Sequence, residues 1–108
     1  MNYNILLIPQ FEKDIKRLSK KFKLIKKDLK KLIDELKENP IQGKSLGDNI
    51  YKIRLSNSSI PTGKSGGFRV ITYLLDEQNN IYLLSIYSKT QQESITDIQL
   101  KELIDTIK

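Results

Sequence analysis

The residues best suited to chemistry in this 108-residue sequence are cations. The chain contains no His and no Cys, which excludes disulfides, metal sites built on thiolates or imidazoles, Cys nucleophiles and Ser-His-Asp triads. Any catalysis must therefore use Lys, Arg, Tyr, Asp or Glu, and we expect neither a metal nor a cofactor.

Four cations are spaced so that a sheet would gather them at one end. Lys52 and Arg54 alternate with apolar residues and so share one face of a predicted strand. Arg69 begins the next strand pattern, and Lys89 follows Tyr87 at the end of the one after it. Such cations repel one another unless an anion lies between them, and phosphate suits both the arginine fork and the lysine charge. The alternative is a set of independent exposed charges on an open sheet face.

A lysine-rich run offers a second possible contact with phosphates. Residues 20–31 contain seven lysines, among which we single out Lys20, Lys23 and Lys27 as candidate RNA contacts. A solvated helix face is the simpler explanation, because the lysines interleave with apolar residues at helical spacing. The two explanations are compatible.

A glycine-rich segment before Phe68 is the third feature. Gly63-Lys-Ser resembles the end of a nucleotide-binding P-loop, but the earlier glycine is missing and a strand follows instead of a helix, which excludes a nucleotide hydrolase. Lys64, Gly66 and Gly67 could still hold a phosphate, since glycines allow the backbone to approach closely. An ordinary flexible connection explains the segment equally well.

The charge distribution favours a polyanionic partner. The formal net charge is +6, and residues 10–40 carry eleven basic and six acidic side chains, whereas residues 71–108 carry three and six. A basic body suggests nucleic acid first and an anionic membrane surface second. The sequence shows no signal peptide and no apolar run of membrane-spanning length, so we expect a cytoplasmic protein.

The N-terminal half predicts one strand and two helices. The apolar run of residues 3–8 predicts a strand buried on both faces. From Phe11 to Leu36 apolar residues recur at steps of three and four, which predicts a helical hairpin that packs on a sheet. Residues 43–49 are interpreted as a loop.

The C-terminal half predicts three strands and a helix. Alternation predicts a strand over residues 51–55, and a hairpin follows over residues 68–75 and 81–87. Thr96 and Gln99 form a capping box that begins the last helix. Its predicted buried side comprises Ile98, Leu100, Leu103, Ile104 and Ile107. The expected fold is α+β in the order β-α-α-β-β-β-α, with a small antiparallel sheet, a helical hairpin on one face and a short C-terminal helix, in one domain over residues 1–108.

At these residues the sequence resembles the RelE/ParE superfamily of bacterial toxins, most closely its HigB-like branch. The resemblance covers nearly the whole chain and is carried by residues 46–54 (LGDNIYKIR), 63–73 (GKSGGFRVITY) and 81–89 (IYLLSIYSK). It implies a RelE-like fold and the toxin of a type II toxin–antitoxin system, held silent by a cognate antitoxin. RelE-like members cut mRNA on the bacterial ribosome, whereas ParE-like members inhibit DNA gyrase.

The resemblance implies metal-independent RNA cleavage by a cationic site. Lys52 and Arg54 resemble the family's basic pair, Arg69 its phosphate-clamping arginine, and Lys89 stands near its late basic residue. A 2′-hydroxyl would attack the adjacent phosphate, with Lys52, its pKa depressed by neighbouring cations, as the candidate base and Lys89 beside the leaving oxygen. The family's late aromatic residue is replaced by Ile95, and Tyr87 is a possible substitute that could stack on a base.

Two other functions compete with this prediction. A ParE-like gyrase inhibitor needs a binding surface but no catalytic cations, so the cationic set disfavours it. A basic nucleic-acid-binding module without activity would account for the lysine run and the net charge alone.

Overall fold

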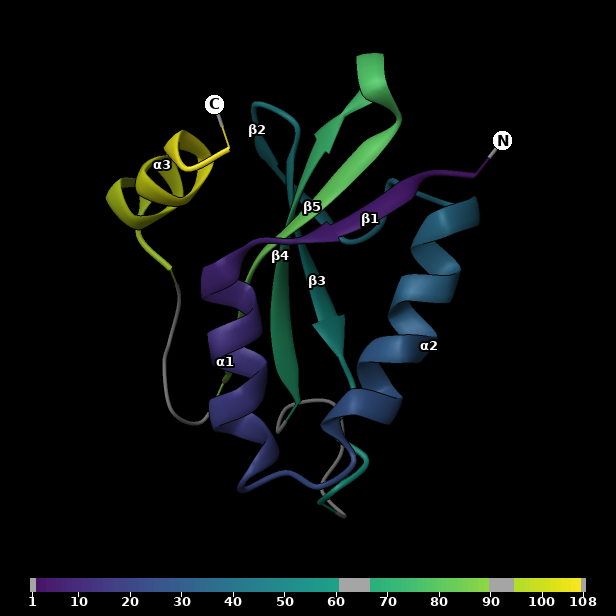
Figure 1. The fold of residues 1–108 in the computed structure, drawn as a ribbon, viewed down its shortest axis with the longest axis vertical. Coiled ribbons are helices and arrows are strands. Elements are labelled where there is room, and N and C mark those ends of the chain that lie inside the picture. Colours follow the sequence, from purple (N-terminus) through teal and green to yellow (C-terminus); the bar gives the residue numbers. More distant parts are fainter. Residues whose placement is uncertain (1, 61–66, 90–94, 108) are drawn as a thin grey trace.

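The computed structural model describes residues 2–60, 67–89 and 95–107, which form one sheet with helices packed on it (Figure 1). The order along the chain is β1 (Asn4–Leu7), α1 (Pro9–Ser19), α2 (Ile25–Glu38), β2 (Lys44–Gly47), β3 (Ile50–Leu55), β4 (Phe68–Leu75), the 3-10 turn η2 (Asp76–Gln78), β5 (Asn80–Ser88) and α3 (Asp97–Asp105). This order confirms the predicted α+β class.

The sheet has the strand order β1-β5-β4-β3-β2. Strands β3 to β5 pair antiparallel, as expected, and β2 pairs antiparallel with β3. β1 pairs parallel with β5, so the sheet is mixed. β1 therefore lies at an edge, and its exposed Asn4 and the 38% exposure of Leu6 contradict the prediction of burial on both faces. A continuous apolar run does not distinguish an edge strand from a central one.

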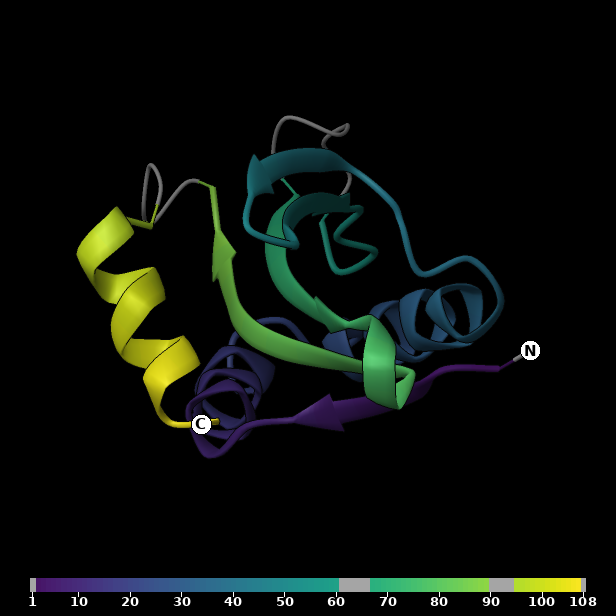
Figure 2. The same cartoon turned by 90° about the horizontal axis from the view of Figure 1, so that it is seen from above.

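Helices α1 and α2 cover one face of the sheet (Figures 1 and 2). α1 begins at Pro9, two residues before the predicted start, because proline suits the first turn of a helix. The core between the layers is apolar and includes Phe11, Leu18, Ile25, Leu36, Val70 and Leu83, all essentially inaccessible to solvent. No helix in the described part of the chain is long and apolar enough to cross a membrane.

The prediction of a loop at residues 43–49 is wrong, because β2 forms there and pairs with β3. Asp48 and Asn49 connect the two strands, and both have positive φ, of 50° and 65°. Tight hairpin turns need this conformation at their two central residues. All four residues of β2 are exposed, so no apolar alternation marks the strand in the sequence.

The capping box of the last helix is confirmed. The Thr96 side chain accepts a hydrogen bond from the Gln99 backbone amide at 3.2 Å, and the Gln99 side chain accepts one from the Thr96 amide at 2.9 Å. The predicted buried side is wrong at Ile98, which is 71% exposed, whereas Leu100 is buried. A helix of nine residues reaches the rest of the molecule along one narrow side only, and Ile98 lies outside it.

Candidate functional site

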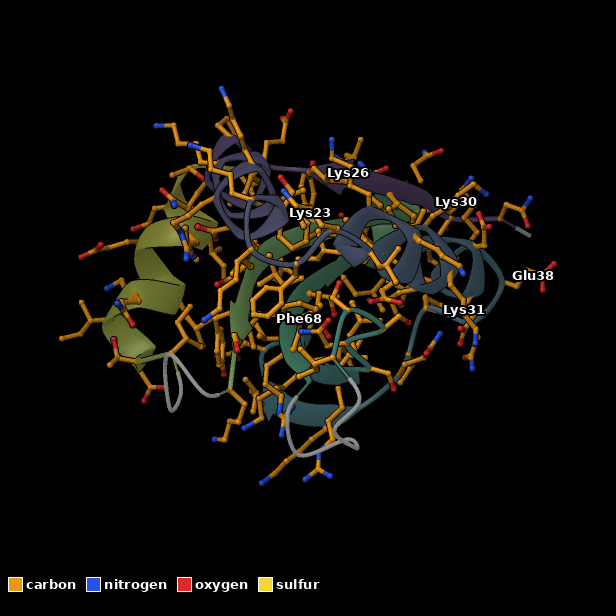
Figure 3. All side chains as sticks on the ribbon, turned by 90° about the horizontal axis from the view of Figure 1, so that it is seen from below. Lys23, Lys26, Lys30, Lys31, Glu38 and Phe68 are labelled. Carbon is orange, nitrogen blue, oxygen red and sulfur yellow. The ribbon has the colours of Figure 1, made fainter. Side chains whose placement is uncertain are left out.

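The start of β4 directs one side chain into the core and the next to the opposite face of the sheet. Phe68 packs edge-on against Phe22, which follows α1, with ring centroids 5.3 Å apart. Figure 3 shows Phe68 in the interior, beneath the two-helix layer. Because successive strand residues point to opposite faces, Arg69 projects away from these helices.

Strand register brings the predicted cations together on that face. Arg54 lies directly opposite Arg69, and Lys52 precedes Arg54 by two residues on the same side of β3. A pocket of about 560 Å³ opens here. It is lined by Gln42, Gly43, Lys44, Lys52, Ile53, Arg54, Arg69 and Lys89. All four cations predicted to be catalytic therefore line one cavity, which we call the cationic pocket.

Arg69 is the pocket residue whose surroundings most strongly favour a bound anion. It is only 7% exposed, and its Nη1 donates to the Phe68 carbonyl at 3.2 Å. Among the described residues no carboxylate forms a salt bridge with it. Burying a charge without a counterion costs several kcal/mol. A bound anion would recover that free energy, and a guanidinium binds phosphate oxygens in a bidentate manner.

The pocket contains three residues that the sequence analysis did not single out. Gln42 and Gly43 precede β2, and Lys44 begins it, so their segment forms one wall of the cavity. Finding them required knowing that β2 pairs with β3, which places Lys44 opposite Lys52. The sequence holds one signal for this hairpin, the Asp48-Asn49 pair, because these residue types accept positive φ.

Tyr87 does not present its ring to the pocket. It lies opposite Arg69 on β5, but it is only 3% exposed and does not line the cavity. Burial raises the pKa of its phenol, against the opposing effect of the Arg69 charge. Tyr87 therefore stays neutral at physiological pH, and in this structure a base has no open ring face on which to stack.

The remaining predicted contacts lie elsewhere. Lys20, Lys23 and Lys27 are exposed on the helical side and do not line the cationic pocket. Figure 3 shows Lys23 beside Lys26, with Lys30 and Lys31 further along α2. Gly67 is close to the pocket, since its carbonyl accepts a hydrogen bond from the Lys89 backbone amide at 3.2 Å. Lys64 and Gly66 lie outside the described residues.

A buried carboxylate ties the segment after β3 to the helical layer. Asp28 of α2 is 8% exposed and accepts hydrogen bonds from the Ser58 amide at 2.9 Å and from the Ser58 hydroxyl at 2.5 Å. The Ser59 hydroxyl accepts another from the Leu24 amide at 2.9 Å. These bonds anchor the chain shortly after Arg54, which limits the movement of that end of β3.

A second and larger cavity, of about 760 Å³, lies between α3 and the β2–β3 hairpin. Its lining includes Asp48, Asp97 and Asp105 beside apolar residues such as Ile50 and Tyr73. Three carboxylates repel a phosphate, so size alone does not identify the site. The cationic pocket is the candidate functional site because its charges suit an anion and because its buried Arg69 has no carboxylate partner within residues 2–60, 67–89 and 95–107.

Fold and pocket together define a small α+β protein with a cation-lined pocket on the face of its sheet away from the two-helix layer. Residues 11–107 match the family model described as the RelE toxin of the RelE/RelB toxin–antitoxin system. The match spans most of the chain, and the protein belongs to this family.

Solved structures of RelE toxins share the fold. A double mutant of the E. coli RelE toxin in the free state has a TM-score of 0.67 and 23% identity, with 100% of each chain covered. The toxin of the intact E. coli RelBE toxin–antitoxin complex has a TM-score of 0.60 and 24% identity, over 78% of this chain and 93% of that one. A RelBE toxin–antitoxin complex from Mycobacterium tuberculosis has a TM-score of 0.61 and 15% identity, over 82% and 92%.

Proposed function

We propose that this protein is a ribosome-dependent, metal-independent endoribonuclease that inhibits translation by cutting mRNA. The observation that carries the proposal is the buried Arg69, which lacks a carboxylate partner in the described structure and lines a pocket with four further cations. Membership of the RelE family supports the same activity.

The proposed reaction uses RNA as its own nucleophile. The 2′-hydroxyl oxygen forms a bond to the adjacent phosphorus, and the bond from phosphorus to the 5′-oxygen of the next nucleotide breaks. Lys52 accepts the proton of the 2′-hydroxyl, and Lys89 stabilises or protonates the leaving oxygen. Arg54 and Arg69 hold the phosphate and stabilise the charge that develops on it. The products are a 2′,3′-cyclic phosphate and a free 5′-hydroxyl.

The ribosome supplies what this pocket lacks. No base can stack on the buried Tyr87, and a lysine is a weak general base, so the RNA must be oriented by another body. The exposed Lys20, Lys23 and Lys27 provide a phosphate-binding surface on the helical side for that larger partner. Because ribosomes are the proposed partner, we propose the cytoplasm as the location of the protein.

We further propose a cognate antitoxin as its protein partner. The supporting observation is that similar RelE toxins have been solved in complex with their antitoxins, in E. coli and in M. tuberculosis. A neighbouring reading frame for a small protein that neutralises the toxin when both are expressed would support this partner. We also propose the HigB-like branch, on the residues at 46–54, 63–73 and 81–89 that carry that resemblance.

The test is to induce the protein in growing bacteria and map new mRNA 5′ ends that carry a hydroxyl. We expect ends clustered within translated codons for the original protein and for Arg17→Ala, an exposed arginine of α1 that serves as a matched control. Arg69→Ala should lower their yield by about 100- to 1,000-fold, because a preorganised donor to the phosphate is lost.

Two outcomes contradict the nuclease. Loss of negative supercoiling of DNA, with mRNA left intact, would favour a gyrase inhibitor. Ribosome or nucleic-acid binding without new 5′ ends would favour a non-catalytic binding module. Arg69→Lys is the control for misfolding of Arg69→Ala. It keeps the positive charge but loses the bidentate fork, so it should recover only part of the activity that Arg69→Ala loses.

A further inference from the structure

Two pairs of like charges face each other across strands in the cationic pocket. Arg54 lies opposite Arg69, and Lys44 lies opposite Lys52. Like charges directly opposite one another destabilise a sheet. Within the described residues none of these four cations forms a salt bridge. The reaction proposed above uses Lys52 as its base and holds one phosphate with Arg54 and Arg69, which leaves Lys44 as a pocket cation without a role in it.

The two pairs have the spacing of a nucleic-acid backbone. Lys52 and Arg54 are separated by one residue of β3, and both line the pocket. Lys52 and Arg54 lie about 7 Å apart along β3, and Lys44 and Arg69 lie on the strands to either side of it, so the centres of the two pairs are about 8 Å apart. This separation is comparable to that between consecutive phosphates along a single strand of RNA.

Lys44 is held in place by the backbone that precedes it. Gly43 has φ of +80°, and a Cβ atom there would lie 2.2 Å from the Lys52 carbonyl oxygen. Only glycine allows so close an approach to β3. The preceding Gln42 is fixed as well, since its Nε2 donates to the Asn39 carbonyl at 2.9 Å. Lys44 therefore enters the pocket from a defined backbone position, although its side chain is exposed.

We propose that Lys44 forms a second phosphate subsite, which binds the nucleotide next to the one that is cut. The inference rests on the proposed function, because Arg54 and Arg69 hold the reacting phosphate in it. The pocket then selects single-stranded RNA that presents at least two consecutive phosphates.

The subsite is tested by binding of short oligonucleotides that cannot be cut. A 2′-O-methyl dinucleotide carries one phosphate and a trinucleotide carries two, and their dissociation constants can be measured by NMR titration. We expect the original protein to bind the trinucleotide about tenfold more tightly. Lys44→Ala should abolish that gain and leave the affinity for the dinucleotide unchanged. Lys13→Ala, at an exposed lysine of α1, is the control and should change neither affinity.

The possible failures are distinguishable from failure of the nuclease. Equal affinities for the two oligonucleotides, or a tenfold gain that survives in Lys44→Ala, would overturn the subsite while leaving the cleavage reaction standing. An equal weakening of both oligonucleotides by Lys44→Ala would also overturn it, because Lys44 would then act as a general charge. No binding of either oligonucleotide would overturn the subsite together with the anion pocket itself.

Discussion

At the residue scale, Arg69 shows a conflict between stability and function. Arg69 is buried and has no carboxylate partner among the described residues, which weakens the folded state, while the same cation makes the pocket ready for an anion before substrate arrives. Its neighbours in the chain explain how the fold retains it. The Phe68 ring is anchored in the core against Phe22, so the backbone of Arg69 is fixed from the opposite face of the sheet.

This conflict predicts that Arg69→Met stabilises the protein. Methionine preserves much of the side-chain volume and removes the buried charge, so the free energy of unfolding should rise by about 1–3 kcal/mol. Urea denaturation in phosphate-free buffer measures it. Arg17→Met is the control and should change stability by less than about 0.5 kcal/mol, because Arg17 is exposed.

A higher stability of Arg69→Met could also come from better packing, and added inorganic phosphate distinguishes that explanation from an anion site. Phosphate should raise the denaturation midpoint of the original protein, since it binds the folded state only, and should leave Arg69→Met unchanged. An Arg69→Met protein that is less stable than the original, together with no response of the original protein to phosphate, would contradict an anion site at Arg69.

At the element scale, the short strand β2 completes the pocket. It contributes Lys44, and the glycine before it crosses β3 at a distance that no other residue permits. On the other side of β3, Asp28 holds the segment that follows the strand through Ser58. These contacts lie at Lys52 and just beyond the C-terminal end of β3, and they limit the movement of the segment that carries both cations.

Gly43→Ala should therefore destabilise the protein and reduce cleavage. The new Cβ meets the Lys52 carbonyl and the positive φ is strained, so we expect a loss of about 2–3 kcal/mol in urea denaturation. Gly47→Ala is a matched control, since Gly47 also has a positive φ, of +90°, but open space around it. It should cost about 1 kcal/mol and spare cleavage. Equal effects of the two variants would argue against the close approach of Gly43 to β3.

At the scale of the whole molecule, positive charge lies on two sides of the sheet. The cationic pocket opens on the face away from α1 and α2, whereas the exposed lysines of α2 lie on the helical side (Figure 3). The two sets cannot bind one short RNA at the same time. A large partner such as the ribosome could engage both, which gives each set a separate task.

This division predicts the behaviour of the triple variant Lys20→Ala, Lys23→Ala and Lys27→Ala. Its affinity for ribosomes should fall, and the slope of log affinity against log salt concentration should become shallower by up to about 2, because about 0.7 is lost for each phosphate contact to a single strand. Ribosome pelleting at several salt concentrations measures the slope. The dinucleotide affinity of the pocket should not change, and a parallel loss there would contradict separate surfaces.

The sequence by itself determined the strands that carry Lys52, Arg54 and Arg69, the two amphipathic helices and the capping box at Thr96. Each of these elements follows from local periodicity or from a local hydrogen bond, and both signals depend only on residues that are close together in the sequence. The four cations could be chosen on the same basis, because alternation places Lys52 and Arg54 on one face of their strand.

Only the tertiary structure decided the rest. It places β1 at an edge, adds β2 and Lys44 to the pocket, and buries both Arg69 and Tyr87. Tertiary packing decides which distant strands pair and which element covers a face of the sheet. Such packing produces no periodic pattern in the sequence. The residue types of the site are therefore local information, but its wall, the absence of a carboxylate partner for Arg69 among the described residues and the burial of the Tyr87 ring are properties of the assembled fold.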